Sequence, residues 1–183
     1  MPLSESQAHA LAVRFQHWDR DHNGYLEWSD MEKAVTRLGD EFGRAPGAAD
    51  LLTLTESCQE FWRVLIQHAD VDRDGRISED EYVSAFGDGV MDDPGVFEGV
   101  FRTLLANVVK VADVNGNGGL DQGEYTRLMG SWYNSGDADA VEAFRLLDTD
   151  GDGLLSTEEL VRSASSAFVE AEPVLLTSPP PSR

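Results

Sequence analysis

Four stretches of twelve residues carry oxygen-bearing side chains at the same spacing, and such groups could hold a hard metal ion. The second stretch, Asp70 to Glu81, has oxygen atoms at its positions 1, 3, 5, 9 and 12 and Gly75 at position 6. This spacing suits Ca²⁺, which takes about six to eight oxygen ligands. The glycine permits the backbone angle that bends the chain around an ion. We expect position 7 to offer its main-chain carbonyl and position 12 to offer both carboxylate oxygens.

The other three stretches keep this pattern with small departures. The fourth keeps every ligand type, the third has amides in place of two carboxylates, and the first ends in Asp30 instead of glutamate. Amide oxygens also bind calcium. The candidate ligands at positions 1, 3, 5, 7 and 12 are Asp19, Asp21, Asn23, Tyr25 and Asp30; Asp70, Asp72, Asp74, Arg76 and Glu81; Asp113, Asn115, Asn117, Gly119 and Glu124; and Asp148, Asp150, Asp152, Leu154 and Glu159.

One such stretch alone has other interpretations: a solvated acidic turn, a dockerin-type calcium repeat, or the Asp-x-Asp of a phosphate-transfer enzyme. In that enzyme the motif follows a buried strand, and dockerin repeats lack an entering helix. Here apolar residues recur at helical spacing before every stretch. Before the fourth they are Ala140, Val141, Phe144 and Leu147. The four stretches therefore resemble EF-hand calcium loops.

Helices must enter and leave these loops. We expect an all-α fold of four EF-hand helix-loop-helix motifs in two paired lobes, packed compactly. Ser78 with Glu81 has the spacing of a capping box, and the third and fourth loops repeat it, so each exiting helix should begin inside its loop. Position 8 is apolar in every loop, and in paired EF-hands these residues meet in short antiparallel β contacts. The expected pairs are Leu26 with Ile77 and Leu120 with Leu155.

Clusters of glycine and proline divide the chain. Those at 87–95 separate an N-terminal lobe, 1–90, from a C-terminal lobe, 91–170, and residues 171–183 form a flexible, Pro-rich tail. Further breaks are expected near Gly39 and at 130–136. An apolar cluster at 174–176 could fold back over the lobes or remain in solvent, and the sequence leaves both open.

The formal charge of −20 is local in origin, since fifteen of the 34 acidic residues lie at positions 1, 3, 5, 9 and 12 of the loops. Bound divalent ions would relieve the self-repulsion of these groups, so the metal-free protein should be less compact. An acidic surface argues against binding nucleic acid or an anionic membrane. The lone Cys58 is expected to be a core residue. Without a secretory leader or a span of ~20 apolar residues, we expect a soluble, cytoplasmic monomer.

Four EF-hands with long early connections, the first closed by Asp30, resemble the sarcoplasmic calcium-binding proteins and the bacterial calerythrin-like group over roughly residues 4–170. The resemblance implies two lobes packed together and a role as calcium buffer. Members of that group often have one or two degenerate loops, whereas all four loops here keep ligands. The expected cofactor is therefore Ca²⁺, up to four ions.

Three functions share this architecture. We favour a Ca²⁺ buffer or signal modulator, because Met31, Met91 and Met129 are the only methionines beyond the initiator and sensors of the calmodulin type expose a methionine-rich groove. The alternative is a sensor that exposes an apolar surface to an unidentified target protein. A calcium-triggered photoprotein of the aequorin type is disfavoured, because no histidine follows His68 to handle a proton. We therefore expect no enzymatic activity.

Asp30 suggests a difference in metal preference between the sites. Aspartate is one methylene shorter than glutamate, so it would reach an ion with a single oxygen and lower the coordination number. Magnesium favours six ligands in octahedral geometry. We expect site one to be the most magnesium-tolerant of the four.

Overall fold

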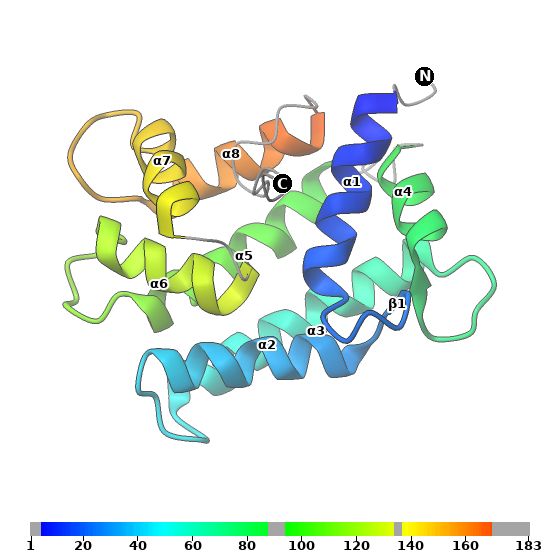
Figure 1. Ribbon diagram of the computed structural model, residues 1–183. Coiled ribbons are helices and arrows are strands. Elements are labelled where there is room, and N and C mark those ends of the chain that lie inside the picture. Colours follow the sequence, from blue (N-terminus) through cyan, green and yellow to red (C-terminus); the bar gives the residue numbers. More distant parts are fainter. Residues whose placement is uncertain (1–4, 88–93, 134–136, 170–183) are drawn as a thin grey trace.

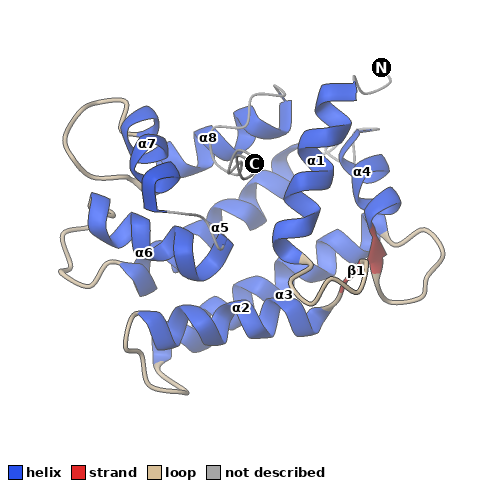
Figure 2. Ribbon diagram, in the orientation of Figure 1, coloured by secondary structure: helices blue, strands red, loops and turns tan. Residues whose placement is uncertain are grey.

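The computed structural model describes residues 5–87, 94–133 and 137–169, and their regular secondary structure is almost entirely helical (Figures 1 and 2). The elements in chain order are α1 (Glu5–Trp18), β1 (Tyr25–Leu26), α2 (Trp28–Glu41), α3 (Ala49–Ala69), β2 (Ile77–Ser78), α4 (Glu79–Gly87), α5 (Pro94–Ala112), α6 (Gln122–Tyr133), α7 (Asp137–Leu147) and α8 (Thr157–Val169). The expected all-α fold is confirmed. Among these helices, none is both long and apolar enough to cross a bilayer.

Consecutive helices form four helix-loop-helix units, α1 with α2, α3 with α4, α5 with α6, and α7 with α8 (Figure 1). Every exiting helix begins at loop position 10. The capping boxes account for this start: the Ser78 hydroxyl accepts the Glu81 N–H at 3.3 Å, and Glu81 Oε2 accepts the Ser78 N–H at 2.9 Å. The third and fourth loops repeat the arrangement, as expected.

The loops pair as the apolar residues at position 8 predict. Leu26 lies opposite Ile77 in the antiparallel ribbon of β1 and β2, drawn red in Figure 2. Leu120 and Leu155 exchange two main-chain hydrogen bonds, of 3.0 and 2.8 Å, in an isolated antiparallel bridge. All four side chains are almost completely buried. Each bridge therefore joins two loops of one half of the chain.

The two halves share one hydrophobic core. Helix α3 packs along α5 and helix α2 packs along α6, so that both helix pairs cross from the first half to the second. The buried residues form one continuous cluster that extends from Leu11 to Leu160. Between α3 and α5 the buried Asn107 amide donates to the Ser57 hydroxyl at 2.6 Å, which satisfies a polar pair that would otherwise be costly to bury. The proposed boundary between lobes falls at 88–93, outside the described residues.

Cys58 lies in this core with an exposed fraction of 0%. Burial raises the pKa of its thiol to about 12, because an apolar surrounding disfavours the thiolate. The expected role as a small core residue agrees with this position.

Helix α2 ends at Glu41, close to the break expected near Gly39. Helix α4 ends at Gly87 and α5 begins at Pro94, within the break expected at 87–95, and proline is tolerated there because a first-turn N–H has no helical partner. The break expected at 130–136 differs from the structure, because helix α6 runs through Gly130 and ends at Tyr133. The reason is tertiary, since Trp132 is buried and packs edge-to-face on Trp18 with ring centroids 5.7 Å apart. The apolar tail cluster at 174–176 lies outside the described residues.

Candidate metal sites

The carboxylate at position 1 closes each loop onto itself. Asp19 Oδ2 accepts the N–H of Gly24 at 2.9 Å, and Asp70 Oδ2 accepts that of Gly75 at 3.1 Å. The third and fourth loops make the same bond to their position 6 glycine. These glycines adopt left-handed φ angles between 82° and 93°, which glycine reaches without a steric penalty. The loop geometry thus follows from the local sequence.

Position 4 is left-handed in every loop as well. Glycine fills it in the third and fourth loops, but His22 has a φ of 55° and Arg73 one of 63° in the first two. Residues with a Cβ seldom adopt such angles, so the first two loops hold some backbone strain. The His22 side chain is exposed, as its loop position predicts.

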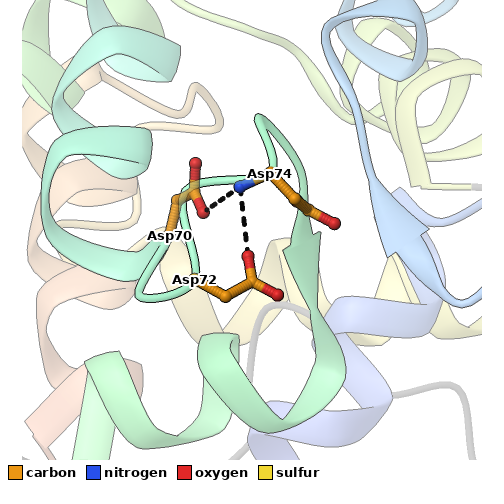
Figure 3. A group of neighbouring side chains, drawn as sticks. All are labelled: Asp70, Asp72 and Asp74. Carbon is orange, nitrogen blue, oxygen red and sulfur yellow. Dashed lines mark hydrogen bonds between the residues drawn. The ribbon is translucent and has the colours of Figure 1, made fainter.

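The structure brings acidic side chains together in two loops. Figure 3 shows Asp70, Asp72 and Asp74 around one turn, where the Asp74 N–H points to both other carboxylates at 3.2 and 3.1 Å. Carboxylate oxygens of the three residues lie within 4.8 Å of one another. The fourth loop repeats this arrangement with Asp148, Asp150 and Asp152. Amides replace some of these carboxylates in the first and third loops, as expected.

The position 12 glutamates reach back over their loops. Glu81 Oε1 accepts the Val71 N–H at 3.0 Å, while Oε2 accepts the Ser78 N–H, so this carboxylate joins loop positions 2, 9 and 12. Glu124 and Glu159 do the same. Burial by itself would raise the pKa of Glu81, but its hydrogen bonds outweigh that effect, and the pKa is lowered. The pKa of Glu159 is lowered for the same reasons. Both carboxylates are thereby held in the ionised form that binds metal.

Asp30 does not reach the start of its loop. Its Oδ2 accepts the Glu27 N–H at 3.0 Å, but no hydrogen bond joins it to positions 2 or 3 in the described structure. Its Oδ1 is buried without a hydrogen-bond partner among the described residues. Burial raises the pKa of this carboxyl, and the nearby Asp21 charge adds to the rise, against the effects of the Glu27 N–H and Lys33. The shorter side chain accounts for the difference from the three glutamates.

Two basic side chains contact candidate ligands: Lys33, which the sequence did not single out, and Arg76, which it offered only for its main-chain carbonyl. Lys33 Nζ lies 3.0 Å from Asp21 Oδ2, and its hydrogen bond lowers the pKa of Asp21. The Arg76 guanidinium lies 2.7 Å from Asp74 Oδ2 and lowers the pKa of Asp74 in the same way. It also lies over the Tyr25 ring, 4.0 Å from the centroid. Lys33 lies three residues after Asp30 on α2, and residues at this spacing are neighbours on a helix surface, so the sequence alone could have indicated this contact.

The donor set fits a hard divalent cation. Asp30 Oδ1 and Asp148 Oδ1 are buried without a hydrogen-bond partner in the described part of the chain, although the Lys33 ammonium lies 3.5 Å from Asp30 Oδ1, and a buried charged oxygen without hydrogen bonds is costly. Both belong to candidate ligands at positions 12 and 1. A bound calcium ion would neutralise these oxygens and draw the loop oxygens into one coordination shell.

Comparisons with known proteins identify EF-hand relatives of this chain. Residues 9–87 match the EF-hand domain pair family, and residues 141–162 match the EF hand family. Calerythrin of Saccharopolyspora erythraea is 32% identical over 155 residues, which cover 82% of this chain and 85% of that protein. The alpha chain of the Penaeus vannamei sarcoplasmic calcium-binding protein is 31% identical over 115 residues, covering 62% of this chain and 59% of that protein.

Solved structures share the fold. A Streptomyces coelicolor calcium-binding protein superposes with a TM-score of 0.79 at 30% identity, covering 92% of this chain and 99% of that one. The photoprotein clytin reaches a TM-score of 0.72 at 17% identity with 92% of both chains covered, a likeness of fold alone. The sarcoplasmic and Streptomyces relatives are named as calcium-binding proteins. The chain belongs to the EF-hand calcium-binding proteins, in the group that contains calerythrin and the sarcoplasmic calcium-binding proteins.

Proposed function

We propose that this protein is a monomeric cytoplasmic calcium buffer that binds up to four Ca²⁺ ions through the candidate ligands of its four loops. The observation that carries the buffering role is the single core shared by the two halves. A sensor must open to expose an apolar surface. Opening these halves would separate helices that are packed together and would leave buried polar groups without partners.

Polar contacts across the halves support a shape that stays closed. The Arg44 guanidinium donates to the Val111 carbonyl at 2.9 Å, next to the end of α5. Arg127 of α6 pairs with Glu41 at the end of α2, with Nε and Oε1 2.8 Å apart, and lies over the Phe42 ring at 4.5 Å. A cation near a helix C-terminus is favourable because of the helix dipole. Separating the halves would break these contacts together.

The distribution of apolar side chains also favours a buffer. Met31 and Met129 are buried at 1% and 3% exposed, so neither offers the flexible surface on which calmodulin-type sensors depend. The large apolar residues that are exposed in the described structure are Leu52, Val71, Val114 and Leu146. They belong to α3, to the second and third loops, and to α7, so they are dispersed through the chain.

A role as calcium sensor is the second candidate. The Streptomyces coelicolor protein, which covers nearly all of this chain's fold, is described as acting in calcium-mediated regulation. A photoprotein role has less support, because His9, His22 and His68 are exposed and the His17 ring nitrogen Nδ1 is engaged with the Val13 carbonyl at 2.7 Å. Buried proton-transfer chemistry would need an imidazole in the core.

Site one is proposed to tolerate magnesium best. Asp30 is the shortest of the position 12 side chains, and its Oδ2 is engaged by the Glu27 N–H, while Oδ1 accepts no hydrogen bond in the described residues and has only the Lys33 ammonium nearby, at 3.5 Å. One carboxylate oxygen in place of two favours a six-ligand shell, which Mg²⁺ requires.

A calcium titration by calorimetry, run in parallel with binding of a hydrophobic dye, tests the proposal. The buffer predicts about four bound ions and dye fluorescence that stays constant or falls. A clear rise in dye fluorescence on adding calcium would favour the sensor. Absence of heat at millimolar calcium would refute calcium binding itself.

A further inference from the structure

We propose that Lys33 is a built-in counter-cation of site one, which holds the ligand carboxylates of that loop and competes with metal ions for them. The inference deepens the proposed function and rests on the assignment of Asp21 and Asp30 as ligands. It adds a residue outside the twelve-residue loop that sets the affinity of the site.

The geometry places the lysine between the two ends of the loop. Lys33 Nζ lies 3.0 Å from Oδ2 of Asp21, at loop position 3, and 3.5 Å from Oδ1 of Asp30, at position 12. These oxygens are two that a metal ion would use. The Asp30 side chain is 1% exposed, and its Oδ1 has no hydrogen-bond partner among the described residues, so the ammonium is the charge that compensates this buried oxygen.

The equivalent residues of the other exiting helices differ. Three residues after position 12, the second loop has Ser84, the third has Arg127 and the fourth has Arg162. Ser84 carries no charge, and Arg127 extends away from its loop to Glu41 at the end of α2. A basic residue placed one turn past the loop therefore need not reach the ligand carboxylates. Lys33 reaches them because Asp30, one methylene shorter than glutamate, leaves its second oxygen available.

Competition follows from charge. A metal ion that binds Asp21 and Asp30 must displace the Lys33 ammonium or bind beside it. If it binds beside the ammonium, the two positive charges repel each other. The lysine is about half exposed, with 46% of its side chain accessible, so water screens the effect and the lysine can swing outward. Removing its charge should tighten calcium binding at site one by about three- to tenfold. Without metal, the same lysine should stabilise the loop.

The test compares Lys33→Met with Arg63→Met in the full-length protein. Arg63 pairs with Glu60 on the exposed side of α3, with Nε and Oε2 3.0 Å apart, so its loss changes the net charge equally without touching a ligand. Terbium luminescence sensitised by Tyr25 and Trp28 reports on site one, and calcium displaces the terbium. Lys33→Arg keeps the charge and should bind like the wild type.

The expected result is tighter site-one binding in Lys33→Met alone, with a lower melting temperature of that variant in chelator. Equal affinities in Lys33→Met and Arg63→Met, or weaker binding in Lys33→Met, would overturn the role of Lys33 while leaving site one in place. Absence of sensitised terbium luminescence from the wild type would instead overturn the assignment of site one, and the inference with it.

Discussion

Two adjacent glutamates of α8 provide a sharp test of the ligand assignment. Glu159 Oε1 accepts the N–H and hydroxyl of Thr149 at 2.9 and 3.0 Å, and Oε2 accepts those of Ser156, both at 3.0 Å. Glu158 instead points outward to Arg102, with Oε1 3.1 Å from Nη1. Replacing either by glutamine removes one negative charge and keeps the shape of the side chain.

The expected loss of stability in Glu159→Gln follows from the hydrogen bonds of this carboxylate. In Glu159→Gln the new amide must turn its NH₂ group toward either Thr149 or Ser156, so at least one main-chain N–H loses its acceptor. This should lower the metal-free free energy of unfolding by about 1–3 kcal/mol. Loss of a charged ligand should also weaken site four by about 100-fold, since carboxylate number is one property that sets the affinity of such loops. Under conditions that saturate the wild type, that site would then contribute up to about 2.7 kcal/mol less to stability.

Calorimetric titration and thermal unfolding, each with calcium and with chelator, measure both effects. Glu159→Gln should lose one ion from the tight stoichiometry and melt at a lower temperature in both conditions. Glu158→Gln should match the wild type in stoichiometry, because an exposed ion pair contributes little. If the two variants lose calcium equally, or neither does, the assignment of Glu159 as a ligand is wrong.

Three further predictions follow from single contacts. Asp30→Glu should raise the calcium affinity of site one and reduce its occupancy by magnesium, measured as the effect of millimolar Mg²⁺ on terbium binding; an unchanged magnesium effect would contradict the argument from side-chain length. Arg127→Met should destabilise the protein by about 1 kcal/mol, a fall of about 2–4 °C in melting temperature. The control is Arg145→Met, which should change the melting temperature little because its partner Glu142 is on the same helix. Equal effects of the two variants would show that the contact between halves contributes nothing. Because burial raises the pKa of Cys58 to about 12, its thiol should resist alkylation at pH 8 with calcium bound and react once chelator loosens the core. Rapid alkylation of the calcium-loaded protein would contradict the burial of Cys58.

Most of the fold could be predicted because its determinants are local. The ligand spacing, the glycine at position 6 and the capping of each exiting helix all lie within twelve residues, where the backbone geometry of the loop leaves few alternatives. The pairing of position 8 residues followed from the EF-hand resemblance and is confirmed for Leu26 with Ile77 and for Leu120 with Leu155. The ligand roles themselves stay predictions until metal binding is measured.

Contacts between distant segments decided the rest. Gly130 reads as a helix breaker, yet the packing of Trp132 on Trp18 carries α6 past it. The stacking of Arg76 over Tyr25 depends on how the paired loops face each other, a relation between residues 51 positions apart. The sequence by itself determined four EF-hand loops and the helices that flank them, since short-range sterics and hydrogen bonds specify these. Only the tertiary structure decided how the halves share a core and which basic side chains reach the candidate ligands, because those outcomes depend on the relative placement of whole helices.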